Sequence, residues 1–122
     1  MQVSDERFHE LIDRAFQSLP ARHRDRVQNV AIVTADEPTG HQRQALKLRC
    51  NETLLGIYEG VPLPERQGRE TVIPDVITLF TGPLLATSET EAELYETIRH
   101  TLWHEIAHYY GLNHAQIHAL ER

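Results

Sequence analysis

The residues whose types and spacing could support chemistry lie near the end of the sequence. His104, Glu105 and His108 form the pattern HExxH, and Gly111 and His114 extend it to HExxHxxGxxH. Two histidines four residues apart lie on one face of a helix, where both imidazoles can bind a single Zn2+. Glu105 lies about 100° further round such a helix, which suits a general base that takes a proton from zinc-bound water.

Gly111 and His114 predict the rest of a metal site. Gly111 can adopt a positive φ and turn the chain after the helix, which brings His114 back towards the metal as a third ligand. Three protein ligands leave one position of a tetrahedral zinc site open, as in catalytic sites. Three histidines also suit other divalent metals, and a helix with ordinary surface histidines is the alternative.

Further histidines and several tyrosines have more than one interpretation. His100 lies one turn before His104 and is either a residue that supports the ligands or a partly exposed polar residue. His118 competes with His114 as a ligand if residues 113–121 are helical. Hydrolysis at this site also needs a donor for the oxyanion, for which the candidates are His100, Tyr58, Tyr109 and Tyr110.

The helix that carries the motif has an apolar face beside its histidines. With His104 at 0° and 100° per residue, the residues between about 80° and 200° are Leu94, Ile98, Leu102, Ile106 and Tyr109. His108 lies at about 40°, so the core-facing side and the histidine side adjoin. Ser88 is the expected N-cap, and the helix is expected to run to Tyr110, before Gly111.

A helix and three short strands precede this motif. Apolar residues at helical spacing predict a helix over residues 5–18, which Pro20 ends before a short second helical stretch. Runs rich in β-branched and aliphatic residues predict strands over 29–34, 54–58 and 76–81.

The segments between these strands are predicted to be irregular. Residues 36–40 predict a turn, residues 41–52 are unassigned, and residues 60–74 predict a long loop. Strands grouped before a helix predict one α+β domain over residues 1–122.

Composition restricts the classes of partner. The 122 residues carry 12 Lys and Arg against 18 Asp and Glu, a net charge of -6, which argues against a nucleic-acid partner. Cys50 is the single cysteine, so no intramolecular disulfide forms. No apolar run approaches the roughly 20 residues of a membrane span, and the acidic N-terminus does not resemble a signal peptide. We therefore expect a cytoplasmic protein without nucleic-acid or membrane partners.

Three segments carry a resemblance to a known family. Residues 56–63 (GIYEGVPL) look like a GxYxGxPL segment, and residues 74–80 (PDVITLF) with 82–84 (GPL) look like a strand that precedes an active-site helix. Residues 104–111 look like an HExxHxxG helix. Together they resemble the small bacterial zincin-like metallopeptidase family, described as possible zinc metallopeptidases with a matrix-metalloprotease-like domain.

The resemblance implies a minimal zincin-like fold, in which a small mixed sheet packs with an N-terminal helix and an active-site helix. It implies that His104 and His108 are zinc ligands, Glu105 is the base, and His114 is the third ligand, where family members often have Asp. It implies an edge strand that binds extended substrate, formed by Val76, Ile77, Thr78, Leu79 and Phe80. The Met-containing turn of metzincins is missing, since Met1 is the only methionine.

The leading hypothesis for function is a zinc metallopeptidase in which Glu105 activates zinc-bound water. The alternative is a catalytically silent, zinc-containing module of the same fold that binds a peptide or protein. A purely structural zinc is a weaker hypothesis, because a structural site has no use for Glu105. A nucleophilic hydrolase is disfavoured, because GxSxG is absent.

Overall fold

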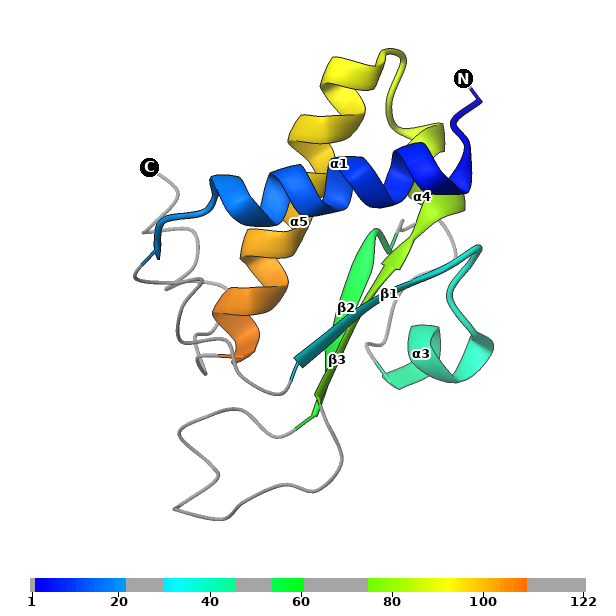
Figure 1. Cartoon of the computed structure of the whole chain (residues 1–122). Helices are drawn as coiled ribbons and strands as arrows, with labels where there is room; N and C mark the ends of the chain where they lie inside the picture. Colours follow the sequence, from blue (N-terminus) through cyan, green and yellow to red (C-terminus); the bar gives the residue numbers. More distant parts are fainter. Residues whose placement is uncertain (1, 22–29, 46–53, 61–74, 110–122) are drawn as a thin grey trace.

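The computed structural model describes residues 2–21, 30–45, 54–60 and 75–109. In chain order the elements are α1 (Asp5–Ser18), β1 (Val30–Ala35), α3 (Gly40–Ala45), β2 (Gly56–Glu59), β3 (Asp75–Phe80), α4 (Thr81–Ala86) and α5 (Glu91–Tyr109). Helix α5 packs on β2 and β3, and α1 packs across α5 (Figure 1). This arrangement confirms the predicted α+β class and the small mixed sheet with its two main helices.

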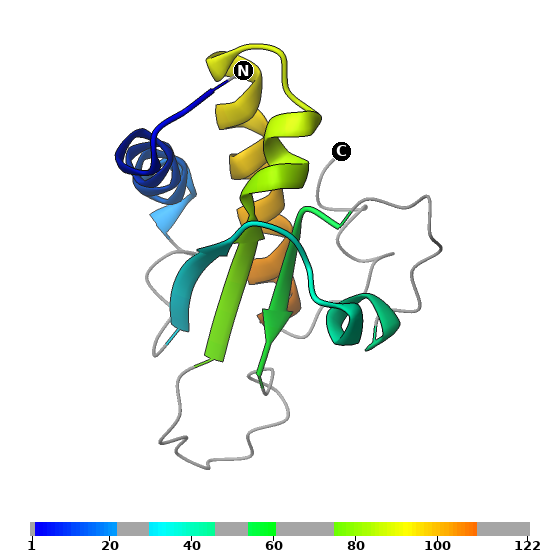
Figure 2. The same cartoon turned by 90° about the vertical axis from the view of Figure 1, so that its right-hand side faces the viewer.

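Strand β3 is the centre of the three-stranded sheet, whose order is β1-β3-β2 (Figure 2). It pairs in parallel with β1, and antiparallel with β2 in a register that places Tyr58 opposite Ile77. The prediction that Val76–Phe80 form an edge strand is therefore wrong. Ladder hydrogen bonds to two neighbours occupy both sides of the β3 backbone, so a substrate strand cannot add to it.

The core lies between the sheet and the two long helices. Helical spacing assigned one face of α5 to the core. The residues of that face whose side chains are described are all 0% exposed: Leu94, Ile98, Leu102 and Ile106. They pack with Leu11 of α1 and with Ile77 and Leu79 of β3. This packing confirms the predicted apolar face and leaves the adjoining face of α5 to the histidines.

The start of α5 differs from the prediction. Thr90, not Ser88, caps the helix: its hydroxyl accepts a hydrogen bond from the Glu93 N–H at 3.1 Å. Ser88 is buried, and its hydroxyl instead donates to the Leu84 carbonyl at 3.0 Å. The preceding helix α4 was not predicted, because Gly82 and Pro83 in sequence indicate only the end of a strand.

Helix α3 lies in a segment that the sequence left unassigned. Its signal is a capping box between Thr39 and Gln42. The Gln42 N–H donates to the Thr39 hydroxyl at 3.0 Å, and the Thr39 N–H donates to Gln42 Oε1 at 2.9 Å. Gln42 also donates to Glu59 Oε1 at 3.0 Å, so α3 holds the end of β2.

The three predicted strands all form, with ends that differ by one or two residues where the structure describes them. The predicted loop over 60–74 lies outside the described residues, apart from Gly60. None of the helices in the described ranges combines the length and apolar character needed to cross a lipid bilayer.

Candidate metal centre

Helix α5 places two imidazoles at the spacing of a shared metal ion. His104 and His108 are partly buried, and their ring centres lie 5.1 Å apart with the planes inclined by 60°. Two imidazoles bound to one tetrahedral zinc ion, at Zn–N distances of about 2.0–2.1 Å, have ring centres about 5 Å apart. The spacing of the two rings is therefore compatible with one shared zinc ion.

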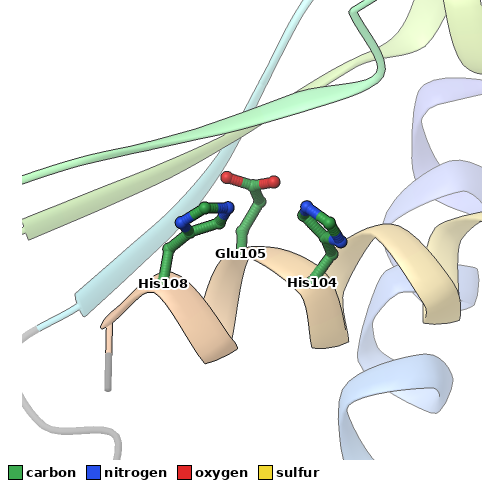
Figure 3. Close-up of side chains that lie close together, drawn as sticks. All are labelled: His104, Glu105 and His108. Carbon is green, nitrogen blue, oxygen red and sulfur yellow. The ribbon is translucent and has the colours of Figure 1, made fainter. Parts of the chain in front are cut away.

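The Glu105 carboxylate lies between the two rings and points towards the sheet (Figure 3). The residue is 8% exposed, and its Oε1 accepts a hydrogen bond from the backbone N–H of Tyr58 at 2.8 Å. Burial raises the pKa of Glu105 to about 7, and the Tyr58 N–H opposes this rise by stabilising the charged form. A carboxyl group with this pKa can both accept and release a proton near neutral pH.

Strand β2 comes close enough to reach Glu105 because Gly56 has no side chain. A Cβ on Gly56 would lie 2.8 Å from Cγ2 of Thr101 on α5. Thr101 is buried, and its hydroxyl donates to the Thr97 carbonyl within the helix. The close contact between β2 and α5 therefore determines where the backbone of Tyr58 meets the histidine-bearing face of α5.

The donor set fits a divalent transition metal. One ligand atom each from His104, Glu105 and His108 lie within 4.8 Å of one another. Two imidazoles suit zinc well, and a nearby carboxylate offsets the positive charge of the ion. The site belongs to a single helix, so the candidate ligand pair is formed by local structure alone.

His100 extends the row of imidazoles by one helical turn. Its ring centre lies 6.3 Å from that of His104, with the planes inclined by 38°, and the residue is exposed. It therefore lies on the side of α5 that carries His104, as its spacing predicts.

Several predicted site residues lie outside the described part of the chain. These are Gly111, His114, His118 and Tyr110, and the side chain of Tyr109 is also outside it. The third ligand remains a prediction. Among the oxyanion candidates, the hydroxyl of Tyr58 donates to Asp75 Oδ2 at 2.6 Å.

Sequence reasoning missed the contact between Tyr58 and Glu105. It joins a backbone N–H to a residue 47 positions away, and no side-chain pattern records such a pair. Asp75 carries a weak signal, because a carboxylate at the start of an otherwise apolar strand is unusual. Glu105 thus has a structural partner as well as facing the histidines. Its presence is therefore compatible with a zinc site that is not catalytic.

Comparison with known proteins points to a single family. The family model described as "zincin-like metallopeptidase" matches residues 27–122. No curated protein matches the chain. Among solved structures, a "conserved hypothetical protein" from Thermo thermophilus is similar, with a TM-score of 0.55 and 19% identity. The match covers 98% of this chain and 100% of that one, and at this identity it concerns the fold alone.

Proposed function

Because the chain belongs to the zincin-like metallopeptidase family, we propose that it is a zinc-dependent peptidase whose general base is Glu105. The observation that carries this proposal is the buried carboxylate between two imidazoles at zinc-binding spacing. Family membership and the His-Glu-His group support metal binding. Peptide hydrolysis is the further step that we propose.

His104 and His108 would hold the metal, and His114 is our proposed third ligand. When bound, zinc supplies Lewis acidity, which polarises a peptide carbonyl and lowers the pKa of water to about 7. The ring centres of the two imidazoles are 5.1 Å apart, a spacing compatible with one shared ion. Their fixed positions on α5 limit the entropy lost on metal binding.

Glu105 would take the proton of the attacking water and pass it to the leaving amine. The carboxylate has two oxygens, of which Oε1 accepts the Tyr58 N–H. Oε2 can then accept the water proton while the first oxygen keeps its partner. The burial that raises the pKa of Glu105 also makes it a stronger base than an exposed carboxylate.

We place the peptide substrate along β2 rather than along β3. In the described part of the sheet, β2 pairs with β3 along one side. The N–H of Tyr58 points to the other side, where it meets Glu105. Since the N–H and C=O of one strand residue point to the same side, the Tyr58 carbonyl also faces the side on which a substrate N–H would approach.

A zinc-containing module that binds a peptide or protein without hydrolysing it is the second candidate. The hydrogen bond from Tyr58 to Glu105 favours it, because this bond is a structural use of the glutamate. In this case zinc would stabilise the C-terminal part of α5 and β2 would present the partner-binding edge.

Peptide cleavage by zinc-loaded protein separates the two candidates. Wild type, Glu105→Gln and His104→Ala are each incubated with a complex peptide mixture, and new termini are identified by mass spectrometry. Glu105→Gln retains an oxygen that can accept the Tyr58 N–H but cannot take a proton. A peptidase produces new termini with the wild type alone.

Undiminished cleavage by Glu105→Gln would refute the role of Glu105. Equal profiles for wild type and both variants, together with capture of the same peptides by wild type and Glu105→Gln, would identify the binding module instead. Zinc content is measured in each sample, so that loss of metal is not mistaken for loss of the base.

A further inference from the structure

We propose that Tyr58 and Asp75 are positioning residues for Glu105. The hydrogen bond between their side chains ties β2 to the central strand, and so holds the Tyr58 backbone N–H where it meets the glutamate. The expected effect of these residues on kcat rests on the proposed peptidase function. Their effect on the position of the Tyr58 N–H does not, and it can be measured in protein without activity.

Two hydrogen bonds of Tyr58 run in different directions. Its hydroxyl donates to Asp75 Oδ2 at 2.6 Å, and its backbone N–H donates to Glu105 Oε1 at 2.8 Å. One residue of β2 thereby links β3 to α5. Movement of Tyr58 relative to β3 would carry its N–H away from the glutamate.

The strand register places Asp75 in position for this bond. Tyr58 lies opposite Ile77, and Asp75 is two residues before Ile77 on the same strand. Side chains two residues apart lie on the same face, so Asp75 is the diagonal neighbour of Tyr58 on the face that packs against α5. Asp75 is 4% exposed, so the bond between them is shielded from competing water.

Gly60 leaves the space that Asp75 requires. The residue has a φ of 156°, and a Cβ at this position would overlap the carboxyl group of Asp75. Any side chain at position 60 would displace the acceptor of the Tyr58 hydroxyl. The end of β2 therefore combines a small residue, a buried acceptor and a phenolic donor at one place.

A tie of this kind matters because β2 is short. The strand has four residues, Gly56–Glu59, and a strand of this length forms few ladder hydrogen bonds with β3. A second side-chain contact at this end joins Gln42 to Glu59 and is exposed, so water competes with it. The buried bond to Asp75 is the stronger restraint on the position of the Tyr58 N–H.

Tyr58→Phe tests the inference, with Tyr95→Phe as the matched control. Tyr95 is a partly buried residue of α5 whose ring lies under Arg14, and the substitution removes the same atom there. The test measures the hydrogen-exchange rate of the residue 58 amide in zinc-free protein, with the exchange rates of the β3 amides as the reference. Tyr58→Phe should speed exchange at residue 58 about tenfold, since loss of one hydrogen bond permits local opening. Tyr95→Phe should leave it unchanged.

The kinetic part uses the same variants loaded with zinc. Tyr58→Phe should lower kcat about tenfold or more, with KM and zinc affinity within about twofold of the wild type, because the base is displaced and the ligands are not. Asp75→Asn keeps an acceptor oxygen for the Tyr58 hydroxyl, so it should retain slow exchange at residue 58 and most of the wild-type kcat. Asp75→Val removes the acceptor and should behave like Tyr58→Phe.

Unchanged exchange at residue 58 in Tyr58→Phe and Asp75→Val would overturn the inference, whatever the activity. If the wild type hydrolyses no peptide, the proposed peptidase function fails. The exchange rates at residue 58 then decide by themselves whether Tyr58 and Asp75 position Glu105. If Tyr58→Phe does not fold, Asp75→Asn and Asp75→Val give the same comparison. A fall in kcat with equal loss of zinc affinity would also contradict it, because the effect would then come from the ligands.

Discussion

Replacing Glu105 with Gln in the metal-free protein should change how stability depends on pH. Glu105 is 8% exposed, and its carboxyl group lies between two imidazoles beside β2, the outer strand of the described sheet on this side. Glutamine has nearly the same shape, is neutral at every pH, and keeps an oxygen for the Tyr58 N–H. The substitution therefore removes the titration of this carboxyl group and little else.

The magnitude follows from the pKa of the buried group. Burial raises the pKa of Glu105 from 4.5 to about 7. Between these values the folded protein keeps a proton that the unfolded chain has released, so the free energy of unfolding falls as pH rises. The two pKa values differ by 7 - 4.5 = 2.5. At about 1.4 kcal/mol for each pH unit, the loss is about 3 kcal/mol once the pH exceeds about 8.

Urea unfolding in the presence of a chelator measures this loss. The free energies of unfolding of wild type and Glu105→Gln are determined from pH 5 to pH 8. The stability of the variant relative to the wild type should rise by about 2–3 kcal/mol over this range, since part of the loss occurs below pH 5. The m-values of the two proteins should agree, which shows that the unfolded states are comparable.

A difference between the two proteins that stays constant with pH would refute the reasoning, because it would mean that burial does not perturb Glu105. The matched control is Glu96→Gln, the same substitution at an exposed position of α5. Solvent screens an exposed charge, so this control should show no comparable dependence on pH. If both variants show the same dependence, the cause is the net charge of the helix and not the buried site.

Three further predictions concern the metal and the packing that supports it. Zinc at about 100 times its Kd should raise the free energy of unfolding by about 2.7 kcal/mol, measured by urea titration. His108→Ala should abolish this gain. His9→Ala, at an exposed position, is the control and should keep it. Leu102→Ala, at a 0% exposed position, should cost about 2–5 kcal/mol by the same measurement, and a cost below about 1 kcal/mol would contradict the core assignment. Gly56→Ala would place a carbon 2.8 Å from a methyl group of α5 and should cost about 1–3 kcal/mol with weaker exchange protection of the Tyr58 amide. Gly40→Ala, which has no atom within 4 Å of the added carbon, is its control and should lower neither property.

Much of the candidate site could be predicted because it depends on local structure. His104 and His108 are one turn apart on a single helix, so their spacing in the sequence determines their spacing in space. The apolar face of α5 was predictable for the same reason, since helical periodicity alone separates it from the histidines. The strands were also predictable from their β-branched composition, although not their neighbours in the sheet.

The predictions that failed have different causes, of which non-local strand pairing is one. An apolar run such as 76–81 predicts a strand, but the order of strands follows from which segments meet in the folded core. Thr90 rather than Ser88 caps α5, because Ser88 is buried and its hydroxyl donates to the Leu84 carbonyl. The short helices α3 and α4 have too few residues for periodicity to be recognised.

The sequence by itself determined the histidine pair, the glutamate beside it and the helix that carries them, because residues up to four apart on a helix have fixed relative positions. Only the tertiary structure decided that β3 is central, that β2 is the strand nearest Glu105, and that Tyr58 and Asp75 meet there. These contacts join residues 17 and 47 positions apart, and they exist only when the sheet and α5 bury their apolar faces together.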